Sequence, residues 1–300
     1  MALLTPVAFF IFNRPDLTAQ VFEAIRQAKP HKLLVVADGA RFPEEEEKCL
    51  KTRQVIKNVD WDCEVLTNFS DTNLGCKYRV SSGLDWVFSQ VEKAIILEDD
   101  CLPEPSFFAF CEELLEYYYN HEQIMHLAGT NLIPQPHLNT SFLFSRLVPI
   151  WGWATWRRAW NHYDIEMKLW NKYKTENDIY YFGKQANNVY NVFESNYLNQ
   201  IDSWDGQWAF NCVANQGLTI IPKINLIKNI GFREDGTHTK AASHICSIPV
   251  QSIDLPLIKP LETIPNKEFD EKFLEFSNRP NPPSLTKSLK NLVKNWIKKY

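Results

Sequence analysis

Several familiar sequence signatures are missing from this chain of 300 residues. It contains no CxxC pair and its seven cysteines are scattered, so neither a cysteine zinc site nor a disulfide framework is indicated. The seven histidines form no HExxH or i, i+4 pair, which argues against a metal site built from histidine. P-loop, GxGxxG and GxSxG patterns are absent as well. The simplest expectation is a protein of a reducing compartment, the cytoplasm.

Excess basic charge and long apolar runs are also missing. The formal net charge of -4 argues against nonspecific nucleic-acid binding as the main activity, so nucleic acid is not an expected partner. The apolar run Ala2–Phe12 is too short to span a bilayer, and it lacks the basic leading segment and the cleavage site of a signal peptide. We expect it to form a buried first strand in a globular chain.

Strand and helix signals alternate over the first 130 residues. Strands separated by helices predict an α/β fold with a mainly parallel sheet and right-handed crossovers. The predicted strands are Val7–Phe12, Leu33–Ala37, Cys63–Thr67, Ala94–Leu97 and Met125–Gly129, and the predicted helices are Pro15–Ala28, Glu44–Asn58, Lys77–Val91 and Pro105–Tyr119.

The rhythm changes beyond Asn131. Ser141–Ile150 predicts a strand that runs into Trp151-Gly152-Trp153, and Leu218–Ile221 predicts a short one. Residues 155–217 are rich in Trp, Tyr and Asn, and they predict mostly helix. Residues 247–283 are rich in proline and weakly periodic, which predicts an extended segment on the surface.

The last sixteen residues, Leu285–Tyr300, contain five lysines and no acidic residue. Their apolar residues have helical spacing, and two interpretations remain open. One is a basic amphipathic helix that lies on an anionic membrane surface, which would place the protein at the inner face of the membrane. The other is a terminal helix that packs on the domain and leaves its lysines in water.

Glu98-Asp99-Asp100 is the densest chemical signal in the chain, because these carboxylates lie between an apolar strand and a turn marked by proline. This order places them at the C-terminal edge of the sheet, where open α/β sheets bind ligands. Clustered carboxylates there suit Mg²⁺ or Mn²⁺, and a solvated acidic turn is the structural alternative. Arg14 follows the first strand and Asp38 ends the second, so both are expected at the same edge. There a guanidinium suits a phosphate, and a carboxylate suits a ribose, although Asp-Gly after a strand is also a common turn.

Several segments together point to a family. They are Phe12-Asn13-Arg14-Pro15, Ala37-Asp38-Gly39, Asn73-Leu74-Gly75, Ile96-Leu97-Glu98-Asp99-Asp100, Trp151-Gly152-Trp153, Trp204-Asp205-Gly206-Gln207-Trp208 and Phe232-Arg233 to Thr237-His238. In this order they resemble the GT-A nucleotide-sugar glycosyltransferases, over about residues 5–240. The stretch from Lys77 to Phe108 is most similar to N-acetylglucosaminyltransferase I and its relatives, in which a Pro-Asp-Phe-Phe-like helix start follows the acidic triplet.

The resemblance implies a GT-A fold, a Rossmann-like mixed and mainly parallel sheet flanked by helices, with a helical, aromatic-rich acceptor region. Residues 1–130 are then expected to bind the nucleotide sugar. Residues 131–245 would form the acceptor and catalytic half of the same domain. Residues 246–300 would contribute the extended surface segment and the basic C-terminal helix.

The resemblance also implies roles for the acidic triplet and its neighbours. Asp100 is expected to bind the Mn²⁺ or Mg²⁺ that bridges the two phosphates of the donor. Glu98 and Asp99 are expected to contact the ribose or the donor sugar. Arg14 and Asp38 would hold the nucleoside.

Further donor contacts are expected from elsewhere in the chain. Asn73, Lys77 and Trp153 lie in segments that match the family. Arg233, His238 and Lys240 belong to a loop expected to close over the diphosphate.

Asp205 is the candidate catalytic base, since the family places a carboxylate in this WDxxW pattern to accept the proton of the acceptor hydroxyl. A sugar hydroxyl is a poor nucleophile until a positioned base takes its proton. Asp202 is a competing candidate. The structural alternative for Asp205 is a helix cap between two core tryptophans.

The resemblance therefore implies an inverting, metal-dependent glycosyltransferase that moves a hexosyl or N-acetylhexosaminyl group from a nucleotide-diphosphate donor, with a UDP-sugar favoured. The acceptor would be a hydroxyl of a glycan or glycolipid, as in polysaccharide biosynthesis. A sugar-phosphate nucleotidyltransferase is one alternative, but the first loop, Asn13-Arg14-Pro15-Asp16, lacks the glycines that a triphosphate loop needs. A non-catalytic glycan-binding or scaffolding module on a GT-A fold is the other. Residues 160–200 and those after about 245 match no family segment, so the acceptor stays open.

Overall fold

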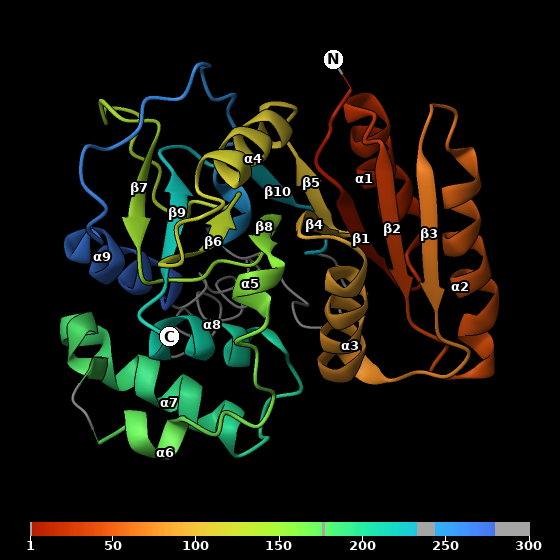
Figure 1. The fold of residues 1–300 in the computed structure, drawn as a ribbon. Coiled ribbons are helices and arrows are strands. Elements are labelled where there is room, and N and C mark those ends of the chain that lie inside the picture. The colour runs from red at the N-terminus through yellow and green to blue at the C-terminus, as the bar shows by residue number, and fades with distance from the viewer. Residues whose placement is uncertain (1, 176–177, 233–243, 280–300) are drawn as a thin grey trace, which may run out of the picture.

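The computed structural model describes residues 2–175, 178–232 and 244–279. At its centre is an eight-stranded sheet (Figure 1). The strands are β1 (Val7–Ile11), β2 (Lys32–Ala37), β3 (Glu64–Phe69), β4 (Lys93–Glu98), β6 (Ile124–Ala128), β7 (Phe142–Ser145), β8 (Trp153–Trp156) and β9 (Leu218–Pro222). Across the sheet their order is β3-β2-β1-β4-β8-β6-β9-β7.

The first half of the sheet has a Rossmann-like order, β3-β2-β1-β4, and all of its strands are parallel. The helices that connect or follow these strands are α1 (Pro15–Ala28), α2 (Pro43–Val55), α3 (Gly75–Gln90) and α4 (Ser106–Tyr117). Every residue of β1 is buried, because helices cover both faces of the sheet. Phe9 packs in one core with α1 and α4, and its neighbour Phe10 packs in a second core with α3.

The second half of the sheet is mixed. Strand β8 runs antiparallel to β4 and to β6, and β7 runs antiparallel to β9, whereas β6 and β9 are parallel. The predicted fold class, a mixed and mainly parallel α/β sheet flanked by helices, is confirmed. The single strand predicted from Ser141 is wrong in detail, because β7 ends at Ser145 and β8 is a separate strand beginning at Trp153. A short antiparallel pair, β5 (Cys101–Pro103) with β10 (Ile227–Asn229), was not predicted.

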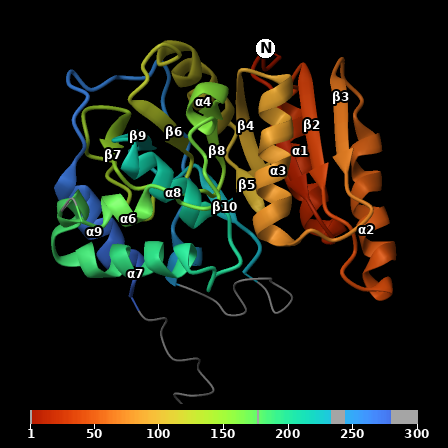
Figure 2. The same ribbon diagram turned by 60° about the horizontal axis from the view of Figure 1, so that its bottom comes forward.

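Helices dominate residues 155–217, as predicted. They include α5 (Arg157–Trp160), α6 (Trp170–Tyr173), the 3-10 segment η2 (Asp178–Gln185), α7 (Ala186–Tyr197) and α8 (Asp205–Ala214). Helices α8 and α3 contribute to the same core, on the same face of the sheet (Figure 2). Trp170, Phe193 and Phe210 form part of a further core that holds this layer together.

The prediction that residues 247–283 are extended is partly wrong. Residues 248–266 have little regular structure, but α9 (Lys267–Ser277) follows them. The side chain of Asn266 caps this helix by accepting a hydrogen bond from the Phe269 nitrogen, at 3.0 Å. Phe269 and Phe273, one turn apart, are buried against the helical layer. The prolines on either side made this short amphipathic pattern difficult to recognise in the sequence.

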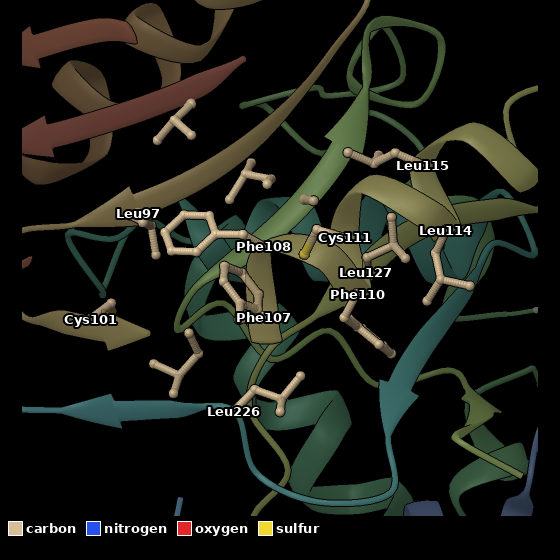
Figure 3. Close-up of a cluster of buried hydrophobic side chains, with 14 of the residues drawn as sticks. Leu97, Cys101, Phe107, Phe108, Phe110, Cys111, Leu114, Leu115, Leu127 and Leu226 are labelled. Carbon is tan, nitrogen blue, oxygen red and sulfur yellow. The ribbon is translucent and has the colours of Figure 1, made fainter. Parts of the chain in front are cut away.

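The acidic triplet is held between two buried residues. Leu97 precedes it on β4 and Cys101 follows it on β5, and neither side chain is exposed. Figure 3 shows both near the phenylalanines of α4, which include Phe107 and Phe108. Packing on each side of the triplet therefore fixes where its carboxylates lie at the edge of the sheet.

Three other sequence expectations concern cysteines, membranes and the C-terminus. The six cysteines whose side chains are described are free thiols. Within the described residues, no helix is long and apolar enough to span a membrane. The basic segment 285–300 lies outside the described residues, so both of its interpretations stay predictions.

Candidate functional site

The strand ends of the first half bring several predicted residues to one edge of the sheet. In the parallel register, Phe10 lies opposite Glu98, and Ile11 lies opposite Ala37. Arg14, Asp38 and the acidic triplet directly follow or end these strands. The predicted meeting of these groups at the C-terminal edge is therefore what the structure shows.

Arg14 is bound to two carboxylates of the triplet. Its Nη2 and Nε donate to Asp99, and its Nη1 donates to Asp100 Oδ2 at 3.0 Å. Burial alone would lower the pKa of Arg14, but the charges of Asp99 and Asp100 raise it above its ordinary value. Asp99 is 2% exposed and also accepts from the Phe12 nitrogen. Asp99 thus orients Arg14, and the contact with a ribose predicted for it has no support in this geometry.

Asp100 is the more accessible carboxylate of the pair. Its Oδ1 accepts a long hydrogen bond from the Cys101 thiol, at 3.5 Å. Gly231 lies directly against it, so that a Cβ added at this glycine would be 2.2 Å from Asp100 Oδ2. The glycine therefore leaves the room that the carboxylate needs, a requirement that the sequence alone did not reveal.

Glu98 is half-buried at the end of β4. Burial raises the pKa of its carboxyl to about 8, and the negative charges of Asp100 and Asp99 add to the shift, with a smaller contribution from Asp205. Asp99 and Asp100 together carry two negative charges against the single positive charge of Arg14. Such a site favours a cation.

Asp38 is a helix cap in this structure. Its carboxylate accepts from the backbone nitrogens of Gly39, Leu74 and Gly75, at 2.9 to 3.1 Å, and from Asn73 Nδ2 at 3.1 Å. A carboxylate has about four lone-pair positions, so these donors saturate it. Asp38 and Asn73 thus hold the first turn of α3, and the nucleoside contact expected of Asp38 has no free acceptor here.

The second half of the sheet brings Asp205 towards the same edge. Asp205 begins α8, and its charge is close enough to raise the pKa values of Glu98 and Cys76. The competing candidate, Asp202, lies beside the start of α3, where a Cβ added at Gly75 would be 3.7 Å from Asp202 Oδ2. The predicted base and the acidic triplet therefore come together from opposite halves of the sheet.

Trp153 is a core residue, which corrects the expected donor contact. Its ring is fully buried in β8 and stacks on His126, with centroids 4.9 Å apart, and on Trp204, at 5.6 Å. The ring is thus occupied by protein neighbours and leaves no surface for a ligand. Its neighbour Trp151 is half-buried and packs edge-on against Phe232.

Lys77 is buried on α3, and its ammonium donates to Asn199 Oδ1 at 2.5 Å. Its ammonium therefore contacts the turn before α8. The sequence had suggested a contact with the donor for this residue. Asn199 and Gln207 were not predicted to matter, although Gln207 lies inside the WDxxW pattern. The predicted phosphate contacts Arg233, His238 and Lys240 lie outside the described residues.

The fit of a metal ion depends on how many protein ligands it needs. Among the residues that the structure describes, no group of three or more His, Cys, Asp or Glu side chains is arranged to hold one. An ion shared with a nucleoside diphosphate needs only one or two carboxylates, because phosphate oxygens and water complete its coordination. Asp100, half-buried in a site of excess negative charge, fits that kind of ion and does not fit a cage made by protein alone.

Comparison with known proteins adds little to this geometry. No protein-family model and no curated protein sequence matches the chain. Among solved structures, it is similar to an active-site mutant of LgtC, with 12% identity and a TM-score of 0.36, over 57% of this chain and 65% of that one. It is also similar to UDP-glucose pyrophosphorylase complexed with UDP-glucose, with 7% identity and a TM-score of 0.36, over 73% and 90%. The chain spans less than two thirds of the LgtC chain, and neither likeness carries an argument about function.

Proposed function

We propose that this protein is an inverting, metal-dependent glycosyltransferase that uses a nucleotide-diphosphate sugar, with a UDP-sugar as the favoured donor. One observation carries the proposal: the segment that leads into Asp205 lies against the start of α3, where Asp202 Oδ2 is 3.7 Å from a Cβ added at Gly75, and Asp38 ties this same glycine to the sheet edge that carries the acidic triplet. The order of the motifs, which resembles the GT-A transferases, supports the same reading. The acceptor is a hydroxyl of a glycan or glycolipid.

The donor side is the edge formed by Arg14 and the triplet. Asp100 would hold a divalent ion together with the donor phosphates, and Arg14 keeps Asp100 oriented from Nη1. The bound ion supplies Lewis-acid stabilisation of the charge that develops on the leaving diphosphate. Asp99 contributes indirectly, because it holds the guanidinium from the other side.

The acceptor side is the start of α8. Asp205 accepts the proton of the attacking hydroxyl as that oxygen bonds to the anomeric carbon. The bond from this carbon to the diphosphate oxygen breaks in the same displacement, so the anomeric configuration inverts. Holding the two reactants in line supplies much of the acceleration.

Calorimetric titration tests the donor assignment. UDP, GDP and dTDP are titrated into the protein with and without Mn²⁺, and into Asp100→Asn, which keeps the shape of the side chain. We expect one nucleotide, UDP, to bind only with Mn²⁺, and to lose this binding in Asp100→Asn. Asp71→Asn is the matched control, because Asp71 is an exposed acid near the same edge.

The opposite result is equally clear. If no nucleotide binds with or without metal, the transferase assignment is wrong and a glycan-binding module replaces it. If a nucleotide triphosphate and a sugar phosphate are joined instead, the protein is a nucleotidyltransferase.

A further inference from the structure

Lys77 is the feature of this site that the assigned roles do not explain. It lies on α3 with only 5% of its surface exposed. Lysine is almost never buried this far unless it is paired, because removing an ammonium from water is costly. Among the described residues its hydrogen-bond partners are neutral amides, and no carboxylate forms an ion pair with it. The burial of this charge without a carboxylate partner therefore indicates a role for the ammonium.

The partners of Lys77 lead to the start of α8. Its ammonium donates to Asn199 in the turn that follows α7, at 2.5 Å. It also lies 3.1 Å from the side-chain oxygen of Gln207, when this amide is oriented so that its nitrogen donates to the carbonyls of Ser203 and Trp204, at 2.7 and 3.2 Å. Ser203 and Trp204 are the two residues before Asp205. Lys77 is therefore connected, through one fully buried amide, to the backbone that leads into the proposed base.

Tight packing makes this connection stiff. A Cβ added at Gly206 would be 2.3 Å from the side chain of Asn196, so α8 begins in direct contact with the end of α7. Asn199 adopts a left-handed backbone conformation, φ +54°, which orders the turn between the two helices. The first turn of α3, which carries Lys77, is itself fixed to the sheet edge, because Asp38 accepts from the Leu74 and Gly75 nitrogens. This one turn of α3 thus joins the donor edge to the start of α8.

We infer that Lys77 is a positioning residue for Asp205: its buried ammonium fixes the first turn of α8 so that the carboxylate faces the donor edge. This inference rests on the proposed function. It also gives Lys77 a different role from the donor contact that the sequence suggested. Loss of the ammonium should leave donor binding intact and slow the chemical step, since a misplacement of about 1 Å can cost about 100-fold in rate.

The test measures UDP release from UDP-glucose and UDP-N-acetylglucosamine, with water as the acceptor. In this reaction the bond between the anomeric carbon and the diphosphate breaks, a carbon–oxygen bond to water forms, and Asp205 takes the proton. We expect Lys77→Met to lower the rate at saturating donor by about 10- to 100-fold. Its Kd for UDP with Mn²⁺ should stay within about twofold of the unmodified protein. Lys77→Arg keeps the charge and should restore part of the rate.

Two further variants separate positioning from a general loss of structure. Asn199→Gly removes the partner side chain but accepts the left-handed conformation, so it should fold and slow the reaction by about 3- to 10-fold. The double variant Lys77→Met with Asp205→Asn should be no slower than Asp205→Asn alone, because residues that act as one unit are not additive. Lys51→Met, in which an exposed lysine of α2 is changed, serves as the control.

Some outcomes contradict the inference. A Lys77→Met variant that loses UDP binding but keeps its rate at saturating donor makes Lys77 a donor contact. If the rate losses of the two single variants multiply in the double variant, Lys77 and Asp205 act independently. If Asp205→Asn stays active, Asp205 is not the base. That result contradicts the proposed function, and the inference about Lys77 falls with it.

Discussion

The two halves of the sheet hold their site residues by different means. In the first half, parallel strands end level with one another, and a charged pair, Arg14 with Asp99, organises the edge. In the second half, Asp205 lies at the start of a helix that is fixed by tight packing and by two buried or turn amides, Asn199 and Gln207, which accept from Lys77. A pair of opposite charges thus orders the donor side, whereas packing and hydrogen bonds from one lysine to neutral amides order the acceptor side. Each half should therefore respond to a different kind of substitution.

The largest expected effect concerns the proposed base. Asp205→Asn should lower the transfer rate by about 10²- to 10⁴-fold, the range over which a positioned base contributes. UDP binding with Mn²⁺ should stay unchanged, because the donor side is built by the other half of the sheet. Initial rates at saturating donor and calorimetry measure the two effects. Asp202→Asn is the control, and a rate loss confined to that variant would transfer the role of base to Asp202.

Removing the cation of the first half should destabilise the fold. Arg14→Met leaves Asp99, 2% exposed, without its partner, and a broken buried pair costs about 3 kcal/mol. Arg26→Met removes an arginine from an exposed pair with Asp60 and should have a far smaller effect. Urea unfolding of both variants makes the comparison. Equal losses would show that the Arg14 pair does not organise the edge.

The two carboxylates that follow β2 and β4 sharpen the comparison within the first half. Asp38 is saturated by hydrogen bonds to α3, so Asp38→Ala should lower the free energy of unfolding by about 2 kcal/mol through its orphaned donors. Asp100→Ala should change stability less and remove nucleotide binding. Thermal unfolding alongside UDP titration separates the two. Asp71→Ala, an exposed acid, should leave both properties nearly unchanged. A stable Asp38→Ala variant that fails to bind UDP would show that Asp38 contacts the nucleoside.

The last expected effect is a pH dependence in the second half. Asp270 of α9 is fully buried and accepts from Ser145 Oγ, Arg146 N and Tyr181 Oη. Burial raises its pKa to about 6, against about 3.9 in an unfolded chain. Between these values the unfolded state binds fewer protons than the folded state.

The contribution of Asp270 to stability is therefore complete below about pH 4, declines as the pH rises to about 6, and then stays level. The free energy of unfolding, measured relative to Asp270→Asn, should fall by up to about 3 kcal/mol across this window. Urea titrations at pH 4 and pH 7 make the measurement. A rise across the window would mean that the hydrogen bonds outweigh the burial.

The same division separates what the sequence could predict from what it could not. Strands such as Val7–Ile11 are buried on both faces, so they appear in the sequence as continuous apolar runs between helical patterns, and α1 has the predicted bounds. In the second half, β8 and α9 are short and lie among aromatic or proline-rich residues. The position of β8 in the sheet depends on pairing between distant segments, such as Ala94 with Thr155, which no local pattern shows.

Site residues divide in a similar way. Arg14, Glu98 and Asp100 could be placed because they end or follow clear strands. The roles expected of Asp38 and Trp153 find no support in the structure, and the features responsible, hydrogen-bond saturation and ring stacking, are tertiary properties that the sequence does not show. Lys77 could be noticed in the sequence. Its partner Asn199 is more than a hundred residues away, so the contact made by the Lys77 side chain could not be predicted.

A crystal of the protein grown with Mn²⁺ and UDP tests the central claim most directly, because the anomalous signal of manganese locates the ion independently of the protein. The account predicts a manganese peak within coordination distance of an Asp100 carboxylate oxygen and of a phosphate oxygen, with the Asp205 carboxylate facing the diphosphate across the site. A peak bound to Asp202 or Asp205 instead, or UDP seated away from the edge formed by β1 and β4, would contradict it.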